Sequence, residues 1–183
     1  MPAAPLMTVD TYFRTPQTVL PAELKFGALR VSDAPNPNHQ SVVAQMFVAL
    51  RTHVLERKLG RMWLSPLDVV LDREKALIVQ PDLMFISNHR NWIVQDRIHG
   101  TPDLVIKILS PNPRIGTIED HLSWFAHYGV RECWLVHQDQ HRISVVGFED
   151  FRASTRRLTG RYDPIVSSVL PQFSMSLQQI LEL

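Results

Sequence analysis

Apolar residues recur at helical spacing in the longest periodic stretch of the chain. Intervals of four, three and four residues separate Val43, Phe47, Leu50 and Val54. This spacing places all four side chains on one face of a helix. We therefore predict a helix over residues 38–59, with Asn38 as its N-cap and Gly60 as its end.

A second amphipathic pattern predicts a helix over residues 118–128, which Thr117 caps and Gly129 ends. Short helices are expected over residues 8–14 and 177–181. Apolar runs between turn residues predict strands over residues 23–26, 28–31, 61–64, 67–71, 76–79, 82–86, 103–109, 133–136 and 143–148. Strands and helices alternate in the second half of the chain. This order indicates an α/β domain with a central mixed β-sheet flanked by helices.

The most apolar of these runs, residues 103–109, carries a lysine. The run is apolar on both faces apart from Asp103 and Lys107, which predicts a central strand covered on both sides. Burying an unpaired charge is costly, so Lys107 should be either paired or functional. Asp82, which opens another predicted strand, is the expected partner. From these residues alone, a purely structural Asp82–Lys107 pair and a chemical site are both open.

Composition limits the classes of protein to consider. The chain has 183 residues, of which 45% are hydrophobic and 20% charged; this fits one globular domain over residues 1–183. The formal net charge of +1 does not by itself indicate nucleic acid, although arginine outnumbers lysine by 15 to 4. The single cysteine, Cys133, excludes an intramolecular disulfide and favours a cytoplasmic location. No apolar run approaches the roughly 18 residues of a membrane span, and the first residues lack a secretion-signal pattern.

Four stretches carry recognisable motifs in order: residues 7–12 (MTVDTY), 81–86 (PDLMFI), 101–111 (TPDLVIKILSP) and 128–136 (YGVRECWLV). Together they resemble the motifs of a large bacterial family of restriction endonucleases with the PD-(D/E)xK nuclease fold. The resemblance runs from Met7 almost to Leu183, so residues 1–6 are expected to be either an extension or the result of a misassigned start. It implies a restriction-endonuclease-like fold and a DNA endonuclease in which a metal-activated water attacks a phosphodiester in line.

The resemblance also implies a Mg²⁺ site. In such proteins the aspartate of the Pro-Asp strand, here Asp82, binds the metal with a glutamate of the following strand and with the next backbone carbonyl, here that of Ile108. An N-terminal glutamate, matched by Glu23, often joins them, and a lysine on the next helix orients water or stabilises charge. This sequence departs from the pattern at two positions. Lys107 stands in place of the strand glutamate, and His121 in place of the helix lysine.

These departures change the expected chemistry, because Mg²⁺ prefers carboxylate oxygens and an ammonium offers none. At about 4 Å and an effective dielectric constant of about 20, Lys107 and Mg²⁺ would repel by roughly 8 kcal/mol. We therefore expect the fold to be kept and cleavage to be weak or lost. The alternative is that Lys107 is itself the catalytic lysine, with Asp82 and either Asp103 or Glu23 holding the metal. His121 is either a proton-transfer group or an ordinary polar residue.

Other candidate residues have two interpretations each. His39, at the start of the long helix, either faces the site or packs locally. His137 and His141 flank a hairpin tip, where a solvated turn is favoured over a metal site. Three arginines fall in predicted loops near the site strands and either contact phosphates or are simply solvated: Arg90, Arg97 and Arg114.

Three functions follow from these observations. The first is a Mg²⁺-dependent DNA endonuclease, the second is a non-catalytic DNA-binding protein with the same fold, and the third is a protein-interaction module. A homodimer is expected in each case, and a membrane partner in none.

Overall fold

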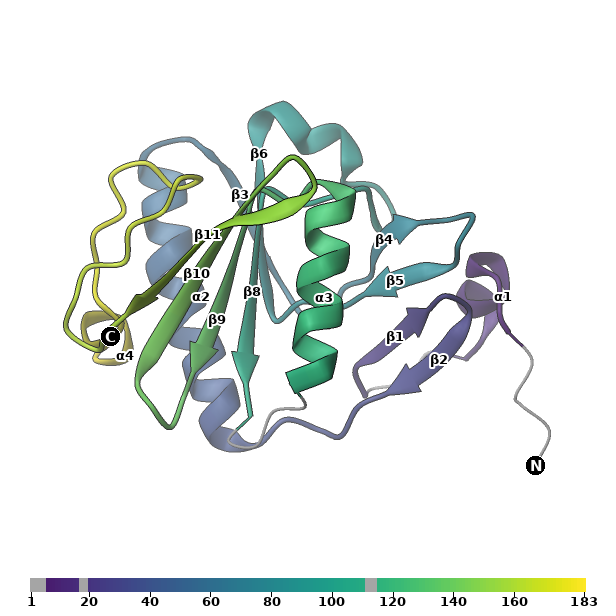
Figure 1. Cartoon of the computed structure of the whole chain (residues 1–183), viewed down its shortest axis with the longest axis horizontal. Helices are drawn as coiled ribbons and strands as arrows, with labels where there is room; N and C mark the ends of the chain where they lie inside the picture. Colours follow the sequence, from purple (N-terminus) through teal and green to yellow (C-terminus); the bar gives the residue numbers. More distant parts are fainter. Residues whose placement is uncertain (1–5, 17–19, 111–114) are drawn as a thin grey trace.

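The computed structural model describes residues 6–16, 20–110 and 115–183. In chain order the elements are α1 (Val9–Arg14), β1 (Ala22–Lys25), β2 (Ala28–Val31), α2 (Pro37–Glu56), β3 (Gly60–Leu64), β4 (Val69–Asp72), β5 (Leu77–Val79), β6 (Leu83–Ser87), the 3-10 helix η1 (Asn88–Ile93), β7 (Ile98–His99), β8 (Leu104–Leu109), α3 (Ile115–Tyr128), β9 (Glu132–His137), β10 (Arg142–Glu149), β11 (Arg152–Thr159) and α4 (Leu177–Leu181). Figure 1 shows that they form two sheets with helices packed against them. No helix in the described ranges combines the length and the apolar character needed to cross a bilayer.

The larger sheet has six strands in the order β11-β10-β9-β8-β6-β3. β8 and β9 run parallel, whereas the other neighbours are antiparallel, so the sheet is mixed. The expectation that the strands near residues 82–86, 103–109, 132–136 and 142–147 share one sheet is confirmed. β8 lies between β9 and β6, and apolar clusters cover both of its faces, as its sequence predicted.

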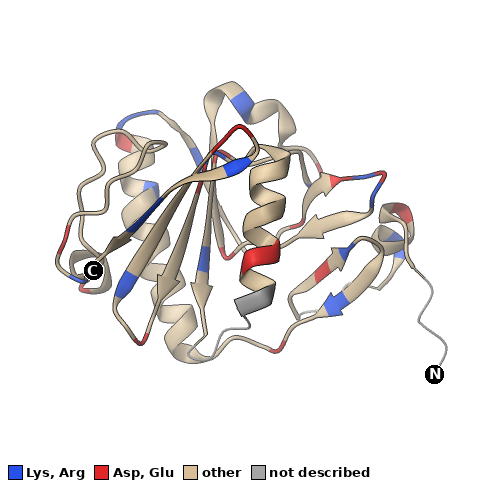
Figure 2. Cartoon of the chain, in the orientation of Figure 1, with Lys and Arg blue, Asp and Glu red and all other residues tan. Residues whose placement is uncertain are grey.

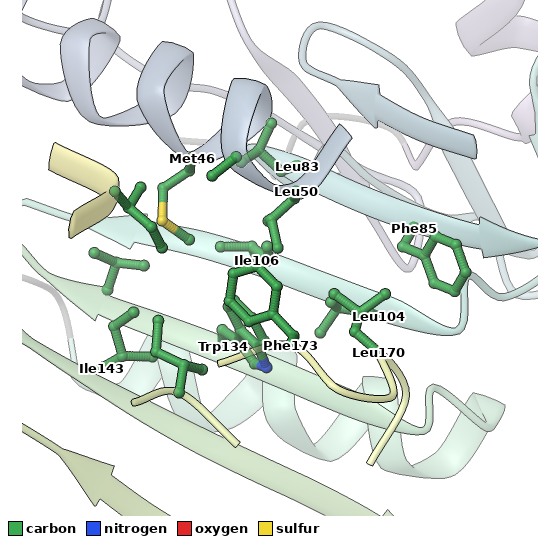
Figure 3. Packing of buried hydrophobic residues seen from close by; sticks show 14 of the residues in the cluster. Met46, Leu50, Leu83, Phe85, Leu104, Ile106, Trp134, Ile143, Leu170 and Phe173 are labelled. Atoms are coloured by element: carbon green, nitrogen blue, oxygen red, sulfur yellow. The ribbon is translucent and has the colours of Figure 1, made fainter. Parts of the chain in front are cut away.

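One face of this sheet is covered by α2 and by the C-terminal segment. In Figure 3, Met46 and Leu50 of α2 point towards the strands, while Leu170 and Phe173 approach from the C-terminal segment. The ring centroids of Trp134 and Phe173 are 5.7 Å apart. The main core therefore combines residues from near position 42 to position 180.

A buried carboxylate anchors the C-terminal segment to the sheet. Glu132 accepts hydrogen bonds from the indole of Trp134 at 2.7 Å, from the Ser167 hydroxyl at 2.6 Å and from the Ser168 amide at 2.7 Å. Glu132 is only 2% exposed. A buried charge is tolerated only when its hydrogen-bonding capacity is filled, and these three donors fill much of it.

The opposite face of the larger sheet is covered by α3 and by the smaller sheet. Leu122 and Phe125 of α3 pack with Val105 and Leu135 of the larger sheet and with Leu77 of the smaller sheet in one cluster. The smaller sheet has the order β2-β1-β5-β4-β7. The prediction of a mixed sheet flanked by helices is thus confirmed, and the separate second sheet is an addition to it.

The long helix begins before the predicted residue. Pro37 takes the first helical position, and the side chain of Asn36 accepts a hydrogen bond from the His39 amide at 2.8 Å. Proline is favoured at this position because its missing N–H would have had no partner. The prediction of Asn38 as N-cap was therefore wrong. The Thr117 cap was also wrong, because Thr117 lies inside α3.

The predicted end of the long helix was also wrong. α2 ends at Glu56, and Lys58 rather than a glycine takes the left-handed conformation, with φ of 53°. Gly60 instead opens β3. A Cβ at Gly60 would lie 2.1 Å from the carbonyl oxygen of Ile86, so the glycine allows close approach of β3 to β6.

Candidate functional site

The candidate residues meet where one end of the larger sheet faces the smaller sheet. Asp82 directly precedes β6, and Lys107 lies on the neighbouring β8, since Leu83 pairs with Ile106. Lys107 is the one charged residue of β8, and the neighbouring strand β6 has none (Figure 2). Glu23 enters from β1 of the smaller sheet, and His121 from α3. The structure thus brings together four residues that are far apart along the chain.

Asp82 has two direct partners. Its Oδ2 accepts a hydrogen bond from the Ile108 amide at 2.7 Å, and its Oδ1 lies 3.4 Å from His39 Nε2. Burial alone raises the pKa of Asp82. The positive charge of Lys107, the His39 contact and the Ile108 amide outweigh burial and hold the pKa below its ordinary value. Of the two interpretations of His39, the structure supports the one in which it faces the site.

Lys107 does not make the direct salt bridge with Asp82 that we predicted. Its ammonium donates a hydrogen bond to the carbonyl oxygen of Gln80 at 3.2 Å, while the Asp82 oxygens face the Ile108 amide and His39. The two charges still interact through space. Burial lowers the pKa of Lys107, but Asp82 and Glu23 outweigh it and raise the pKa above its usual value. Lys107 is therefore a protonated cation beside both carboxylates.

Glu23 is paired with His121. His121 Nε2 lies 3.2 and 3.0 Å from the two carboxylate oxygens, and the backbone N–H of Gln80 donates to Glu23 Oε1 at 3.2 Å. Lys25 Nζ is 3.6 Å from the other oxygen. Burial alone raises the pKa of Glu23, but the His121 hydrogen bond and the charges of Lys107, His121 and Lys25 lower it to about 2. Glu23 is thus ionised, and both of its carboxylate oxygens have protein partners.

Gln80 links these groups and was not identified from the sequence. Besides its contacts with Lys107 and Glu23, its side-chain amide donates to Asp68 at 2.8 Å. Asp68 also accepts from the guanidinium of Arg97 at 3.2 Å. The only sequence signal was the position of Gln80 just before Pro81-Asp82, and a polar residue before a turn is too common to be informative.

The groups present do not fit a Mg²⁺ site of the family type. Across the described parts of the chain, no three His, Cys, Asp or Glu side chains converge as metal ligands. Glu23 and Asp82 are both directed to protein partners, and the cation of Lys107 lies beside them. Hard cations need several oxygen ligands. The arrangement instead forms a network of two carboxylates, Glu23 and Asp82, with two ammonium groups and two imidazoles.

Asp103 cannot serve as the further carboxylate of this site. It lies four residues before Lys107, which is about 13 Å along a strand. Its oxygens accept from the Ser87 amide at 2.8 Å and lie 3.9 Å from Arg90 and 3.7 Å from Arg131. The sequence-based alternative that used Asp103 to hold a metal was therefore wrong, because Asp103 belongs to a separate ion cluster at the other end of β8.

Of the three arginines expected near the site, the two that the structure describes, Arg90 and Arg97, lie in different places. Arg97 joins the Gln80 network through Asp68 and stacks over the Phe13 ring, with 5.3 Å from its Cζ to the ring centroid. Arg90 is at the Asp103 end of β8. Arg114 lies outside the described residues.

A small cavity adjoins Lys107 and His121. It has a volume of about 20 Å³ and is otherwise lined by Leu109, Ile118, Leu122, Phe125 and Leu135. This volume holds about one water molecule. The Lys107 side chain thus lines an apolar cavity, while its ammonium bonds to the Gln80 carbonyl oxygen.

Comparison with known proteins agrees with this fold. A search of curated proteins found no match. A crystal structure from Anabaena variabilis ATCC 29413, titled as a "putative nuclease belonging to DUF820", superposes with a TM-score of 0.81 at 16% sequence identity. The match covers 96% of this chain and 98% of that one, and at this identity it establishes similarity of fold. The model of the Uma2 family, described as "Putative restriction endonuclease", matches residues 9–178. This chain belongs to that family.

Proposed function

We propose that this protein is a DNA-binding member of its endonuclease-like family whose Mg²⁺-dependent cleavage is weak or lost. One observation carries the proposal: the Lys107 ammonium lies beside Glu23 and Asp82, close enough to lower the pKa of both carboxylates. Restriction-endonuclease-like families generally use a divalent metal. Here an internal cation already balances the two carboxylates that a metal would need.

The internal cation opposes metal binding in two ways. A Mg²⁺ ion near Asp82 would be repelled by Lys107, by roughly 8 kcal/mol at about 4 Å and an effective dielectric constant of about 20. It would also have to displace the Ile108 amide from Asp82 or His121 from Glu23. Without tight metal binding, no water of low pKa is available for hydrolysis.

The test is to rebuild the family pattern. The double variant Lys107→Glu with His121→Lys should bind Mg²⁺ in a calorimetric titration and nick supercoiled plasmid, whereas the wild-type protein should do neither at a comparable level. Adding Asp82→Ala to the double variant should abolish both gains. The variant Lys75→Glu makes the same substitution as Lys107→Glu but at an exposed lysine, and it should behave like the wild-type protein.

One result would contradict this proposal directly. If the wild-type protein nicks plasmid as fast as the double variant and Asp82→Ala abolishes that nicking, the site is active as it stands. Lys107 would then be the catalytic lysine, with Asp82 and Glu23 as the carboxylates. The proximity of Lys107 to both groups makes this the second candidate function.

DNA binding is the part of the proposal that does not need cleavage. Arg97, Arg90 and Arg114 are proposed as phosphate contacts, and binding should weaken steeply as salt is raised because counterion release drives it. A gel-shift series that detects no complex even at the lowest salt concentration would remove DNA as a partner. We also propose that residues 1–183 act as one domain and that the protein is a homodimer.

A further inference from the structure

The two edges of the larger sheet differ in their protection. β11 carries three arginines, Arg152, Arg156 and Arg157, and its pairing with β10 is interrupted by a bulge next to Gly147. Charged side chains and bulges are common means of blocking an edge against further strands. β3, at the other edge, has the sequence Gly-Arg-Met-Trp-Leu and a continuous register with β6. With one arginine and no bulge, the β3 edge is less protected than the β11 edge.

The free main-chain groups of β3 can be assigned from its pairing with β6. Leu59 accepts from the Asn88 amide at 3.0 Å, and the Ser65 amide donates to Asp82 at 3.0 Å. The main-chain groups of the odd-numbered residues therefore hydrogen-bond to β6. In an antiparallel strand the main-chain groups of the residues between them are directed away from that neighbour. The N–H and C=O groups of Met62 and Leu64 consequently face outwards, and no described residue hydrogen-bonds to them.

A groove and an exposed apolar stripe accompany this edge. The groove has a volume of about 200 Å³ and is lined by Arg51, Val54, Leu55, Arg61, Met62 and Trp63. Val48 and Leu55 of α2 are 53% and 50% exposed, and Leu64 of β3 is 44% exposed. Within the described ranges, neither Arg51 nor Arg61 has an ion-pair partner, and the buried indole nitrogen of Trp63 has no acceptor. The edge thus offers both polar and apolar groups for a partner.

We propose that the partner is a second copy of this chain, joined by antiparallel pairing of the two β3 strands about a twofold axis at Met62. In that register Met62 stands opposite its own copy, and Leu64 opposite Gly60 of the partner subunit. Arg61 stands opposite Trp63 of the partner subunit. A guanidinium over an indole ring is a favourable cation–π pair, and the twofold axis forms this pair twice. β3 is therefore self-complementary in sequence as well as in its main-chain groups.

The same axis adds apolar contact. A twofold axis perpendicular to the sheet keeps the two α2 helices on the same face of the joined sheet. The exposed side chains of Val48 and Leu55 on one α2 helix then face those on the other. The smaller sheet also has an exposed edge at β2, where Leu29 is 43% exposed. Among the described strands, β2 pairs with β1 alone, and the register of β1 with β5 consists of the single pair Leu24 and Ile78. A partner strand added at β2 would pair with a strand that is itself weakly held in the smaller sheet. We therefore assign the dimer interface to β3.

Three matched variants each place one lysine on a different edge strand: Leu64→Lys on β3, Leu158→Lys on β11 and Leu29→Lys on β2. Light scattering after size-exclusion chromatography should give twice the 21.0 kDa chain mass for the wild-type protein and for the β11 and β2 variants. Leu64→Lys should raise the dimer dissociation constant at least tenfold, with an unchanged circular dichroism spectrum. Arg61→Ser, which removes the cation–π pair and leaves the core intact, should weaken the dimer in the same direction.

Hydrogen exchange supplies a second readout that depends on the register. The amides of Met62 and Leu64 should exchange more slowly as protein concentration rises, and this effect should disappear in Leu64→Lys. A monomeric wild-type protein at millimolar concentration overturns the proposal, and so does a dimer that survives Leu64→Lys or is lost with Leu29→Lys. None of these outcomes depends on whether the protein binds or cleaves DNA.

Discussion

Replacing Glu23 with glutamine should remove a large part of the acid sensitivity of this protein. The folded state lowers the pKa of Glu23 from 4.5 to about 2, so the folded protein binds this proton more weakly than the unfolded chain does. The stabilisation is therefore fully present above about pH 4.5 and is lost as the pH falls towards 2. Glutamine cannot titrate, so the variant lacks this contribution at every pH.

The magnitude follows from the difference between the two pKa values. Each unit corresponds to about 1.4 kcal/mol, so the drop from 4.5 to about 2 amounts to about 3 kcal/mol at neutral pH. At pH 3 the group is still ionised in most folded molecules but protonated in the unfolded chain, and about 2 kcal/mol of that stabilisation is lost. The side chain is only 13% exposed, so solvent screening reduces these figures little.

Urea unfolding at pH 7 and pH 3 measures this effect. The wild-type protein should lose about 2 kcal/mol more between the two pH values than Glu23→Gln does. Glu149→Gln, at an exposed glutamate, should keep the wild-type pH dependence. If Glu23→Gln and the wild-type protein lose the same free energy between pH 7 and pH 3, the pairing of Glu23 with His121 and Lys107 is not a folded-state feature.

Two further predictions concern stability. Asp82→Ala leaves the partly buried Lys107 with one carboxylate fewer, so it should cost about 3 kcal/mol and lower the melting temperature by on the order of 10 °C. The exposed Asp139→Ala should have little effect, and equal shifts would show that Asp82 is not part of the charge network. Gly60→Ala places a Cβ against the Ile86 carbonyl and should cost about 2 kcal/mol in chemical denaturation, and an unchanged midpoint would mean that β3 does not approach β6 this closely.

The sequence predicted the larger sheet well because its strands are locally distinctive. β8 is apolar on both faces and α2 along one face because those faces are buried. Such burial can be recognised from the spacing of apolar residues in the sequence. The ends of α2 were predicted less well, since Asn36 and Asn38 are both good caps and only the position of Pro37 distinguishes them. The smaller sheet joins strands through non-local pairs such as β4 with β7, for which no local pattern exists.

The residues of the candidate site were named from the sequence, but their contacts were not. Glu23, Asp82, Lys107 and His121 do meet, as the resemblance implied. The prediction of a direct Asp82–Lys107 salt bridge was wrong because a backbone amide and an imidazole contact the Asp82 oxygens instead. Which of several nearby acceptors a long lysine side chain selects depends on distances of a few tenths of an ångström, and sequence spacing does not resolve these.

The anchoring of the C-terminal segment by Glu132 has a consequence for synthesis in the cell. Ile165, Leu170, Phe173 and Ile180 are all part of the core that covers Trp134. While the chain is being made at about 5–20 residues per second, the part of that face that these four residues cover stays open to water until they have left the ribosome. Nascent chains should therefore expose a large apolar surface for several seconds and bind a chaperone there, and a stop codon near position 160 should yield an aggregating product rather than a shortened native protein.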